Sequence, residues 1–250
     1  MNAHNKRQFI LAPAGSGKSF ASKIMPDVIK DVDFGYYKRL AGIDYIDQNS
    51  DKAKKLLATY DFQNAQKDWP VNFVRAVADA YETHPVVVTP TYSTASGLVE
   101  LISEGKGNRE QIKNFVEKML VKFQELFPNY VFDDAKLEEL TDSLIVELKR
   151  LRQFDIEPVV TVFADQQAIE ENVQRIHARP EKGEIGKKPE DWETDVALGL
   201  RANELSERLV ATGKYSKLIM YSGQTFADAF QQNEIERAIT YPDFADGAEI

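Results

Sequence analysis

The sequence predicts an α/β protein built around a parallel sheet, and three observations support this fold class. First, five short apolar runs of strand length, rich in β-branched and aromatic residues, are distributed along the chain. Second, several of these runs are apolar on successive residues, as expected for strands that are covered on both faces. Third, helical patterns separate the runs, and strands that alternate with helices favour parallel pairing with right-handed crossovers.

The expected elements follow one another in a simple order. The runs that predict strands are RQFILA (7–12), DVIKDVDF (27–34), HPVVVTPT (84–91), EPVVTVFA (157–164) and SKLIMYS (216–222). The patterns that predict helices between them cover residues 18–24, 70–81, 165–179 and 194–212. We therefore expect a single domain over residues 1–250.

Two segments depart from this alternation. Residues 108–153 are long, polar and helix-periodic, and Pro128 and Asn129 divide them into two helices. We interpret this segment as a helical insertion between the third and fourth strands. Residues 177–192, HARPEKGEIGKKPEDW, combine Gly and Pro with many charges, a composition typical of a mobile, lid-like loop.

Composition argues against several classes of protein. The chain has no cysteine, which excludes a disulfide framework and a thiolate metal site. No apolar run approaches the ~20 residues of a membrane span, and the opening residues, MNAHNKRQFI, lack the apolar core of a signal peptide. These observations predict a cytoplasmic protein with no membrane partner. The net charge of −9 argues against nucleic acid as a partner unless a local basic patch exists.

The stretch between the first strand and the first helix predicts a nucleotide-binding loop. Residues 12–19, APAGSGKS, match the phosphate-binding pattern G-x-x-x-x-G-K-[ST], except that Ala12 replaces the first glycine. Lys18 would reach the β- and γ-phosphates of ATP, and the Ser19 hydroxyl would bind Mg²⁺. The structural alternative is a glycine-rich turn with a solvated lysine. The residues expected to bind ATP are Ala14, Gly15, Ser16, Gly17, Lys18, Ser19 and Phe20.

The second predicted strand ends in two carboxylates, Asp31 and Asp33. Alternation places both on the same side of the strand, and the carboxyl end of a parallel strand lies at the ligand-bearing edge of the sheet. We expect Asp31 to position Mg²⁺ and Asp33 to orient the acceptor or take its proton as a catalytic base. The alternative is that the pair only ends the strand and caps the next turn.

The third and fourth strands carry weaker signals at their ends. The third ends in Thr89, Pro90 and Thr91, without the carboxylate of the usual Walker B motif. Asp165 follows the fourth strand, and we expect it to cap the next helix rather than to act in catalysis.

Arg175 and Arg179 lie four residues apart, and so on one face of the predicted helix 165–179. The helix leads into the basic loop, and phosphoryl transfer needs movable cations over the developing charge. We expect both arginines to act catalytically as lid residues. A solvated helix end, whose cations favour the C-terminal dipole, is an equal explanation.

Together these motifs resemble those of the P-loop small-molecule and nucleotide kinases. The loop APAGSGKS, the Asp-x-Asp strand end and the arginine-bearing helix with its loop carry the resemblance. It implies a three-layer P-loop NTPase fold, nucleotide-kinase-like, with a five-stranded parallel sheet in the order 2-3-1-4-5. It also implies triphosphate binding by Gly15, Gly17 and Lys18, and lid roles for Arg175 and Arg179.

A more specific similarity is to nucleotide kinases of bacteriophages. It is carried by DVDFGYYK, KDWPVNFVRAV and KLIMYSGQTFADAF, which with the phosphate loop and VVVTPTYSTASGLVE span most of the chain except residues 108–153. The Asp31 and Asp33 pair resembles that of shikimate-type kinases, where it serves Mg²⁺ and the acceptor. Ala12, the missing Walker B carboxylate and the insertion depart from the family pattern. The insertion could cover an acceptor, form a homodimer face or dock a partner.

The expected function is an ATP- and Mg²⁺-dependent kinase that phosphorylates a nucleotide or nucleoside, with a deoxynucleoside monophosphate as the first choice. One alternative is a kinase that acts on a nucleic-acid end or on a modified base in DNA, which the net charge disfavours. Another is a non-catalytic switch, in which nucleotide binding controls the docking of a partner.

Overall fold

The computed structural model describes residues 6–32, 69–90, 101, 108–126, 131–178, 192–232 and 235–236. The strands are β1 Arg7–Ala12, β2 Ile29–Asp31, β3 Val86–Pro90, β4 Ile156–Phe163, β5 Ser216–Met220 and β6 Ile235–Glu236. The helices are α1 Lys18–Ile24, α4 Trp69–Thr83, α6 Arg109–Leu126, α7 Asp134–Leu151, α8 Gln166–His177, α9 Trp192–Ala211 and α10 Phe226–Gln231.

The strands form one sheet in the order β2-β3-β1-β4-β5-β6. The first five are parallel, which confirms the predicted five-stranded order 2-3-1-4-5. β1 lies at the centre, where Phe9 pairs with Val87 of β3 and Ile10 pairs with Val159 of β4. The short strand β6 was not expected from the sequence, and it pairs antiparallel to β5 at the edge.

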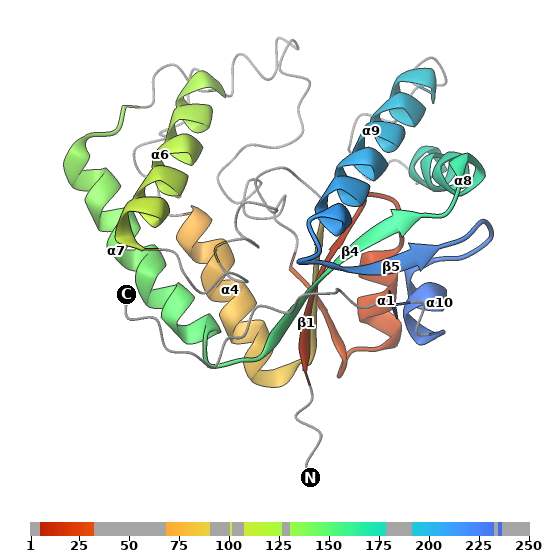
Figure 1. The fold of residues 1–250 in the computed structure, drawn as a ribbon, viewed down its shortest axis with the longest axis horizontal. Helices are drawn as coiled ribbons and strands as arrows, with labels where there is room; N and C mark the ends of the chain where they lie inside the picture. Colours follow the sequence, from red (N-terminus) through yellow and green to blue (C-terminus); the bar gives the residue numbers. More distant parts are fainter. Residues whose placement is uncertain are drawn as a thin grey trace.

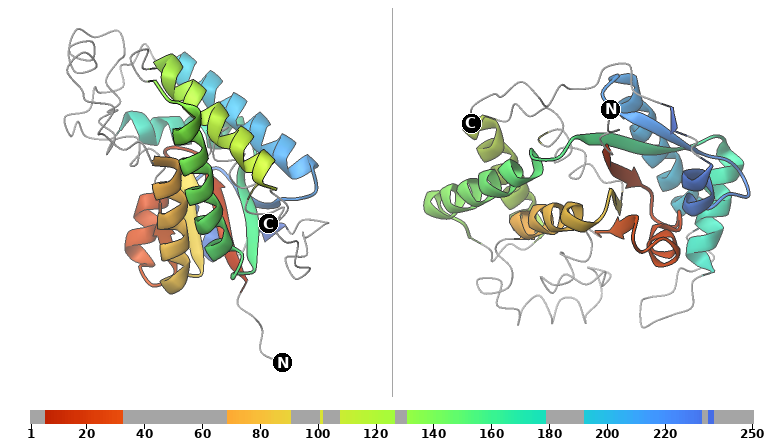
Figure 2. Two further views of the ribbon diagram at one scale, coloured as in Figure 1. Left: turned by 90° about the vertical axis from the view of Figure 1, so that its left-hand side faces the viewer. Right: turned by 90° about the horizontal axis from the view of Figure 1, so that it is seen from below.

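Helices cover both faces of the sheet, because alternate residues of β1 enter two different cores. Phe9 and Leu11 pack with residues of α4, α6 and α7. Ile10 and Ala12 pack with residues of α1, α8 and α10 on the opposite face. Figure 1 and the right-hand view of Figure 2 show these two groups of helices on either side of the strands. The strands are therefore buried on both sides, which explains their apolar runs.

The predicted helices are present, with shifts at several ends. α1 has the predicted bounds, and α4 extends beyond its own at both ends. α9 begins two residues before the predicted start and ends one residue before the predicted end. The segment 108–153 contains two helices, α6 and α7, as expected. Asp133 caps the start of α7, and its side chain accepts a hydrogen bond from the Lys136 amide. α10 was not predicted, although Thr225 and Asp228 form a capping box at its start.

One difference in helix length affects the predicted site. α8 ends at His177, two residues earlier than expected, and Ala178 caps it. In the sequence, Pro180 follows the cap residue by two positions, where proline is common after a helix end. Arg175 therefore lies on α8, whereas Arg179 lies outside the described residues, so its place on the same helical face stays a prediction.

Ion pairs connect α4 to α7 on one side of the sheet. Glu147 of α7 is 5% exposed, and Arg75 of α4 donates to its carboxylate at 2.7 Å. Arg150 donates to the same carboxylate at 2.9 Å and reaches Asp79 and Glu82 of α4, each at 2.7 Å.

A helix that crosses a membrane must be both long and apolar. Among the described residues, no helix meets both requirements.

Candidate functional site

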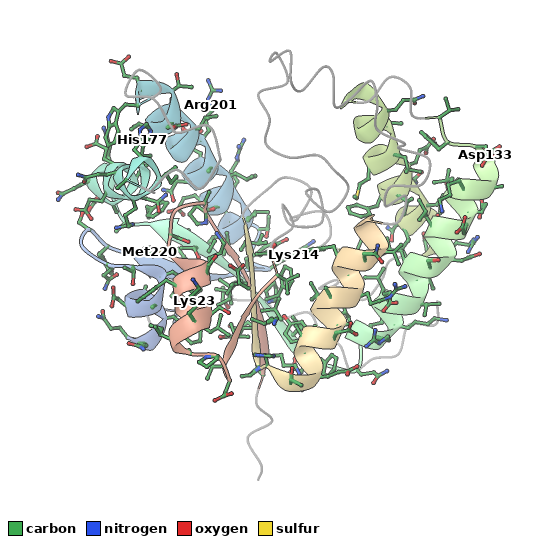
Figure 3. The ribbon with its side chains drawn as sticks, turned by 180° about the vertical axis from the view of Figure 1, so that it is seen from behind. Lys23, Asp133, His177, Arg201, Lys214 and Met220 are labelled. Atoms are coloured by element: carbon green, nitrogen blue, oxygen red, sulfur yellow. The ribbon has the colours of Figure 1, made fainter. Side chains whose placement is uncertain are left out.

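The predicted phosphate-binding segment lies where β1 passes into α1. We call residues 12–19 the glycine loop; it follows the carboxyl end of the central strand, next to the ends of β3 and β4. In open parallel sheets this edge is where ligands bind. Figure 3 shows Lys23 of α1, His177 of α8 and Met220 of β5 on the same side of the molecule, with Asp133, the cap residue of α7, on the opposite side.

Two glycines give the loop its shape. Gly15 and Gly17 have φ values of 85° and 97°, in the left-handed region that residues with a side chain rarely adopt. A Cβ atom at Gly15 would also lie 2.5 Å from Cγ1 of Ile176 on α8. Gly15 is therefore required both by the backbone conformation and by the close approach of α8. Gly17 is the N-cap residue of α1, so no side chain caps this helix.

Lys18 is folded against the loop that precedes it. Its side chain is 7% exposed, and Nζ donates to the carbonyl oxygens of Ala12 at 3.1 Å and Pro13 at 2.9 Å. The positive charge is thus placed at the glycine loop rather than in bulk solvent. This excludes the alternative of a freely solvated lysine.

The two predicted Mg²⁺ ligands are in direct contact. Ser19 Oγ donates a hydrogen bond to Asp31 Oδ2 at 2.5 Å. Asp31 is the last residue of β2, opposite Val88 of β3, and Ser19 lies in the first turn of α1. The sheet and the first helix therefore bring together a hydroxyl and a carboxylate that are twelve residues apart in sequence.

The other loop residues differ in their surroundings. Ser16 is fully buried, and within the described part of the chain its Oγ has no hydrogen-bond partner. Ala14 is exposed, and Phe20 is 56% exposed on α1. The carboxyl end of β3 adds another buried hydroxyl, because Thr89 is fully buried and its Oγ1 also lacks a partner among the described residues.

Arg175 lies partly buried on α8. Burial lowers the pKa of its guanidinium, while Glu171 and Asp228 oppose this effect. Its Nε is buried without a hydrogen-bond partner in the described structure. Two hydrogen bonds from Thr225, together with the charge of Arg175, hold the pKa of the Asp228 carboxyl below its usual value. Arg175 is thus close enough to α10 to interact electrostatically with its first turn.

Several predicted residues have a different status. Asp33, Arg179 and the loop residues 179–191 lie outside the described residues, so their roles stay predictions. Asp165 caps α8 as expected, because its Oδ1 accepts from the Ala168 amide at 2.8 Å. Among the described residues no group of three His, Cys, Asp or Glu side chains could hold a metal ion.

Sequence reasoning missed two contacts that hold the loop from outside. Asn172 of α8 donates through Nδ2 to the carbonyl of Ala14 at 2.7 Å, and the Phe226 amide donates to the carbonyl of Ser16 at 2.8 Å. One signal could have revealed Asn172, because it is a polar residue on the apolar stripe of α8. The members of this stripe are Ala168, Ile169, Asn172, Val173 and Ile176.

Comparison of the chain with protein-family models and with curated proteins finds no match. The residues of the site itself define its chemistry. It combines a lysine, a hydroxyl paired with a carboxylate, and a glycine-bearing loop at the carboxyl edge of a parallel sheet.

Proposed function

We propose that the protein is an ATP- and Mg²⁺-dependent kinase and that the glycine loop is a phosphate-binding P-loop. The contact between Ser19 and Asp31 beside Lys18 carries this proposal. It unites, at one edge of the sheet, a cation for phosphate and two oxygen groups suited to Mg²⁺. The sequence motif supplies the same residues independently, and the resemblance to nucleotide kinases supports the same reaction class.

The residues present fit a magnesium ion. Mg²⁺ in proteins is usually held by one or two carboxylates together with waters and substrate phosphates. Because the Ser19 hydroxyl donates its hydrogen bond to Asp31, the lone pairs of the hydroxyl oxygen remain for the metal. Asp31 would then orient Ser19 and add negative charge close to the ion. When bound, Mg²⁺ would neutralise charge on the β- and γ-phosphate oxygens of ATP.

Lys18 and the loop amides would hold the triphosphate. The Nζ atom of Lys18 already lies at the loop, so little reorganisation is needed when phosphate oxygens approach. In the transfer, the acceptor oxygen forms a bond to the γ-phosphorus, the bond to the β-phosphate oxygen breaks, and ADP leaves. Arg175 and Arg179 would stabilise the charge that develops on the transferred group.

The acceptor we propose is a nucleotide or nucleoside, and first a deoxynucleoside monophosphate. A monophosphate acceptor has ionised oxygens and needs no base, whereas a hydroxyl acceptor must lose a proton. Asp33 would take that proton or orient the acceptor. Replacement of Asp33 by Asn therefore separates the two cases: near-normal turnover removes the base role and favours a monophosphate.

The test is a phosphate-transfer screen. Purified protein, Mg²⁺ and γ-labelled ATP are incubated with nucleosides, ribo- and deoxynucleoside monophosphates, hydroxylated metabolites and DNA. Lys18→Ala should abolish the labelled product. Lys23→Ala is the matched control, because Lys23 is an exposed lysine on the same helix, and it should leave product formation unchanged.

The outcomes separate the proposed function from its alternatives. A labelled nucleotide that depends on Lys18 supports the proposal and identifies the acceptor. If DNA is the labelled product, the acceptor is a nucleic-acid end or a base in DNA and not a small molecule. ATP binding that depends on Lys18, with no product on any acceptor, would overturn the kinase and favour a nucleotide-controlled switch.

A further inference from the structure

Backbone carbonyl oxygens of the glycine loop accept hydrogen bonds from Lys18 or from residues outside the loop. Lys18 Nζ donates to the carbonyls of Ala12 and Pro13. The Ala14 and Ser16 carbonyls accept hydrogen bonds from residues outside the loop. Their donors come from α8 and α10, which lie far away in sequence.

The donor from α8 is the side chain of Asn172. This residue is 4% exposed, and its Nδ2 lies 2.7 Å from the carbonyl oxygen of Ala14. A carbonyl can only accept, so the nitrogen of the amide must face the loop. The next turn of α8 packs against the same part of the loop, because the Ile176 side chain lies close to Gly15.

The donor from α10 is a backbone amide. Phe226 is the first residue of this helix, and the first amides of a helix have no acceptor within it. The Phe226 amide donates instead to Ser16 at 2.8 Å. The capping box of Thr225 and Asp228 fixes the start of α10, and so the position of this donor.

The hydrogen bonds from Asn172 and from the Phe226 amide determine the directions of the Gly15 and Gly17 N–H groups. The carbonyl of Ala14 and the amide of Gly15 belong to one peptide unit, as do the carbonyl of Ser16 and the amide of Gly17. The described chain has no cis peptide bond, and in a trans peptide the N–H points opposite to the C=O. Gly15 N–H therefore points away from α8, and Gly17 N–H points away from α10.

We propose that Asn172 is a positioning residue for phosphate binding, which acts by turning the Gly15 amide toward the phosphates. The inference rests on the proposed function, because it assumes that the glycine loop binds a polyphosphate. The Phe226 amide turns the Gly17 amide in the same way. α8 and α10 thus preorganise two donors, so that binding does not have to reorient these peptide units.

The test uses Asn172→Leu, which removes the donor without adding charge. Mg²⁺–ATP binding is measured by calorimetry for the wild type, for Asn172→Leu and for Gln174→Leu. Gln174 is an exposed amide on the same helix and provides the matched control. We expect affinity about tenfold weaker in Asn172→Leu, as for the loss of one well-oriented hydrogen bond, and unchanged affinity in the control.

Amide resonances of individual glycines distinguish a role of Asn172 in orienting the Gly15 amide from a general destabilisation of the fold by the substitution. In protein labelled with ¹⁵N-glycine, saturation with Mg²⁺–ATP should shift the Gly15 and Gly17 amide resonances in the wild type. In Asn172→Leu the Gly15 shift should diminish while the Gly17 shift persists, because Phe226 still anchors Ser16. If Leu prevents folding, Asn172→Ala removes the same donor with a smaller side chain.

The results separate this inference from the proposed function. If wild-type protein binds ATP but Asn172→Leu keeps both the affinity and the Gly15 shift, the positioning role is wrong and the P-loop stands. Equal loss of the Gly15 and Gly17 shifts would also overturn the specific role of Asn172. If the wild type binds no ATP and neither glycine responds, the proposed function itself is wrong.

Discussion

Ser19 Oγ and Asp31 Oδ2 are joined by a hydrogen bond of 2.5 Å that links the first turn of α1 to the end of β2. The contact pairs a hydroxyl beside Lys18 with a carboxylate on β2, which β3 separates from the central strand β1. A hydroxyl oriented in this way is suited to bind a cation through its lone pairs. The Ser19–Asp31 pair therefore leads to the first prediction.

Replacement of Asp31 by Asn should raise the Mg²⁺ concentration needed for half-maximal ATP binding by about tenfold or more, the range expected when a metal's supporting carboxylate is lost. Asn can still accept the hydrogen bond from Ser19, so the change isolates the charge. Titration of ATP binding with Mg²⁺ measures the effect. Asp27→Asn, at an exposed carboxylate of the same segment, is the control. An unchanged Mg²⁺ requirement would exclude Asp31 from the metal site.

Replacement of Gly15 by Ala should destabilise the fold more than the same change at Gly223. Both glycines have positive φ, so both variants carry backbone strain of about 1–2 kcal/mol. Only at Gly15 would the new Cβ overlap another atom, Cγ1 of Ile176 at 2.5 Å, whereas at Gly223 nothing lies within 4 Å. Such overlap adds about 1–3 kcal/mol.

Denaturant unfolding of the two glycine variants measures the difference. Adding Ile176→Ala to Gly15→Ala should recover part of the steric cost, because it removes the two Ile176 atoms that the new Cβ meets and leaves the Asn172 carbonyl oxygen at 3.0 Å. Equal unfolding free energies for Gly15→Ala and Gly223→Ala would show that α8 yields readily at this contact.

The losses of unfolding free energy caused by replacing Arg75 and Arg150, the two cations paired with Glu147, should not be additive. Arg75 and Arg150 both pair with this carboxylate, which is 5% exposed. Either single replacement by Ala leaves one cation in place. The double replacement leaves a buried charge unpaired, and we expect it to cost about 3 kcal/mol or more. A double-mutant cycle from denaturant unfolding measures the coupling, and simple additivity would contradict the prediction.

The contribution of Asp228 to stability should depend on pH in the acid range. Hydrogen bonds from Thr225 hold the pKa of the Asp228 carboxyl in the folded protein below its usual value of 3.8. The stabilisation is therefore fully present above pH 3.8 and is lost as the pH falls through the depressed pKa.

The measurement for Asp228 is the difference in unfolding free energy between the wild type and Asp228→Asn as a function of pH. The difference should be constant near neutral pH and should shrink on acidification. A difference that grows as the pH falls would have the wrong sign and would show that the capping box does not favour the ionised carboxyl.

Several features of the fold could be predicted because their signals are local. β1 and β4 are recognisable from continuous apolar runs, since both faces of the sheet are covered. The glycine loop is recognisable from Gly15, Gly17 and Lys18, whose residue types suit a tight turn that binds phosphate. The pairing of Ser19 with Asp31 followed partly from the same reasoning, because parallel strands bring their carboxyl ends to one edge.

Other features could not be predicted because they depend on contacts between distant segments. Asn172 contacts Ala14 across 158 positions of sequence, and no local pattern specifies that partner. The strand β6 has only two residues, too few for a periodic signal. α10 has six residues, and its start is marked only by the Thr225 and Asp228 capping box.

The sequence by itself determined the fold class, the strand order implied by its resemblance, and the residue types of the glycine loop. These follow from hydrophobic periodicity and from a motif within eight consecutive residues. Only the tertiary structure decided how the loop is held: α8 and α10 supply donors to the carbonyls of Ala14 and Ser16. The physical reason is that peptide orientation depends on hydrogen-bond partners, and these partners come from elements that meet only after the sheet and its helices have packed.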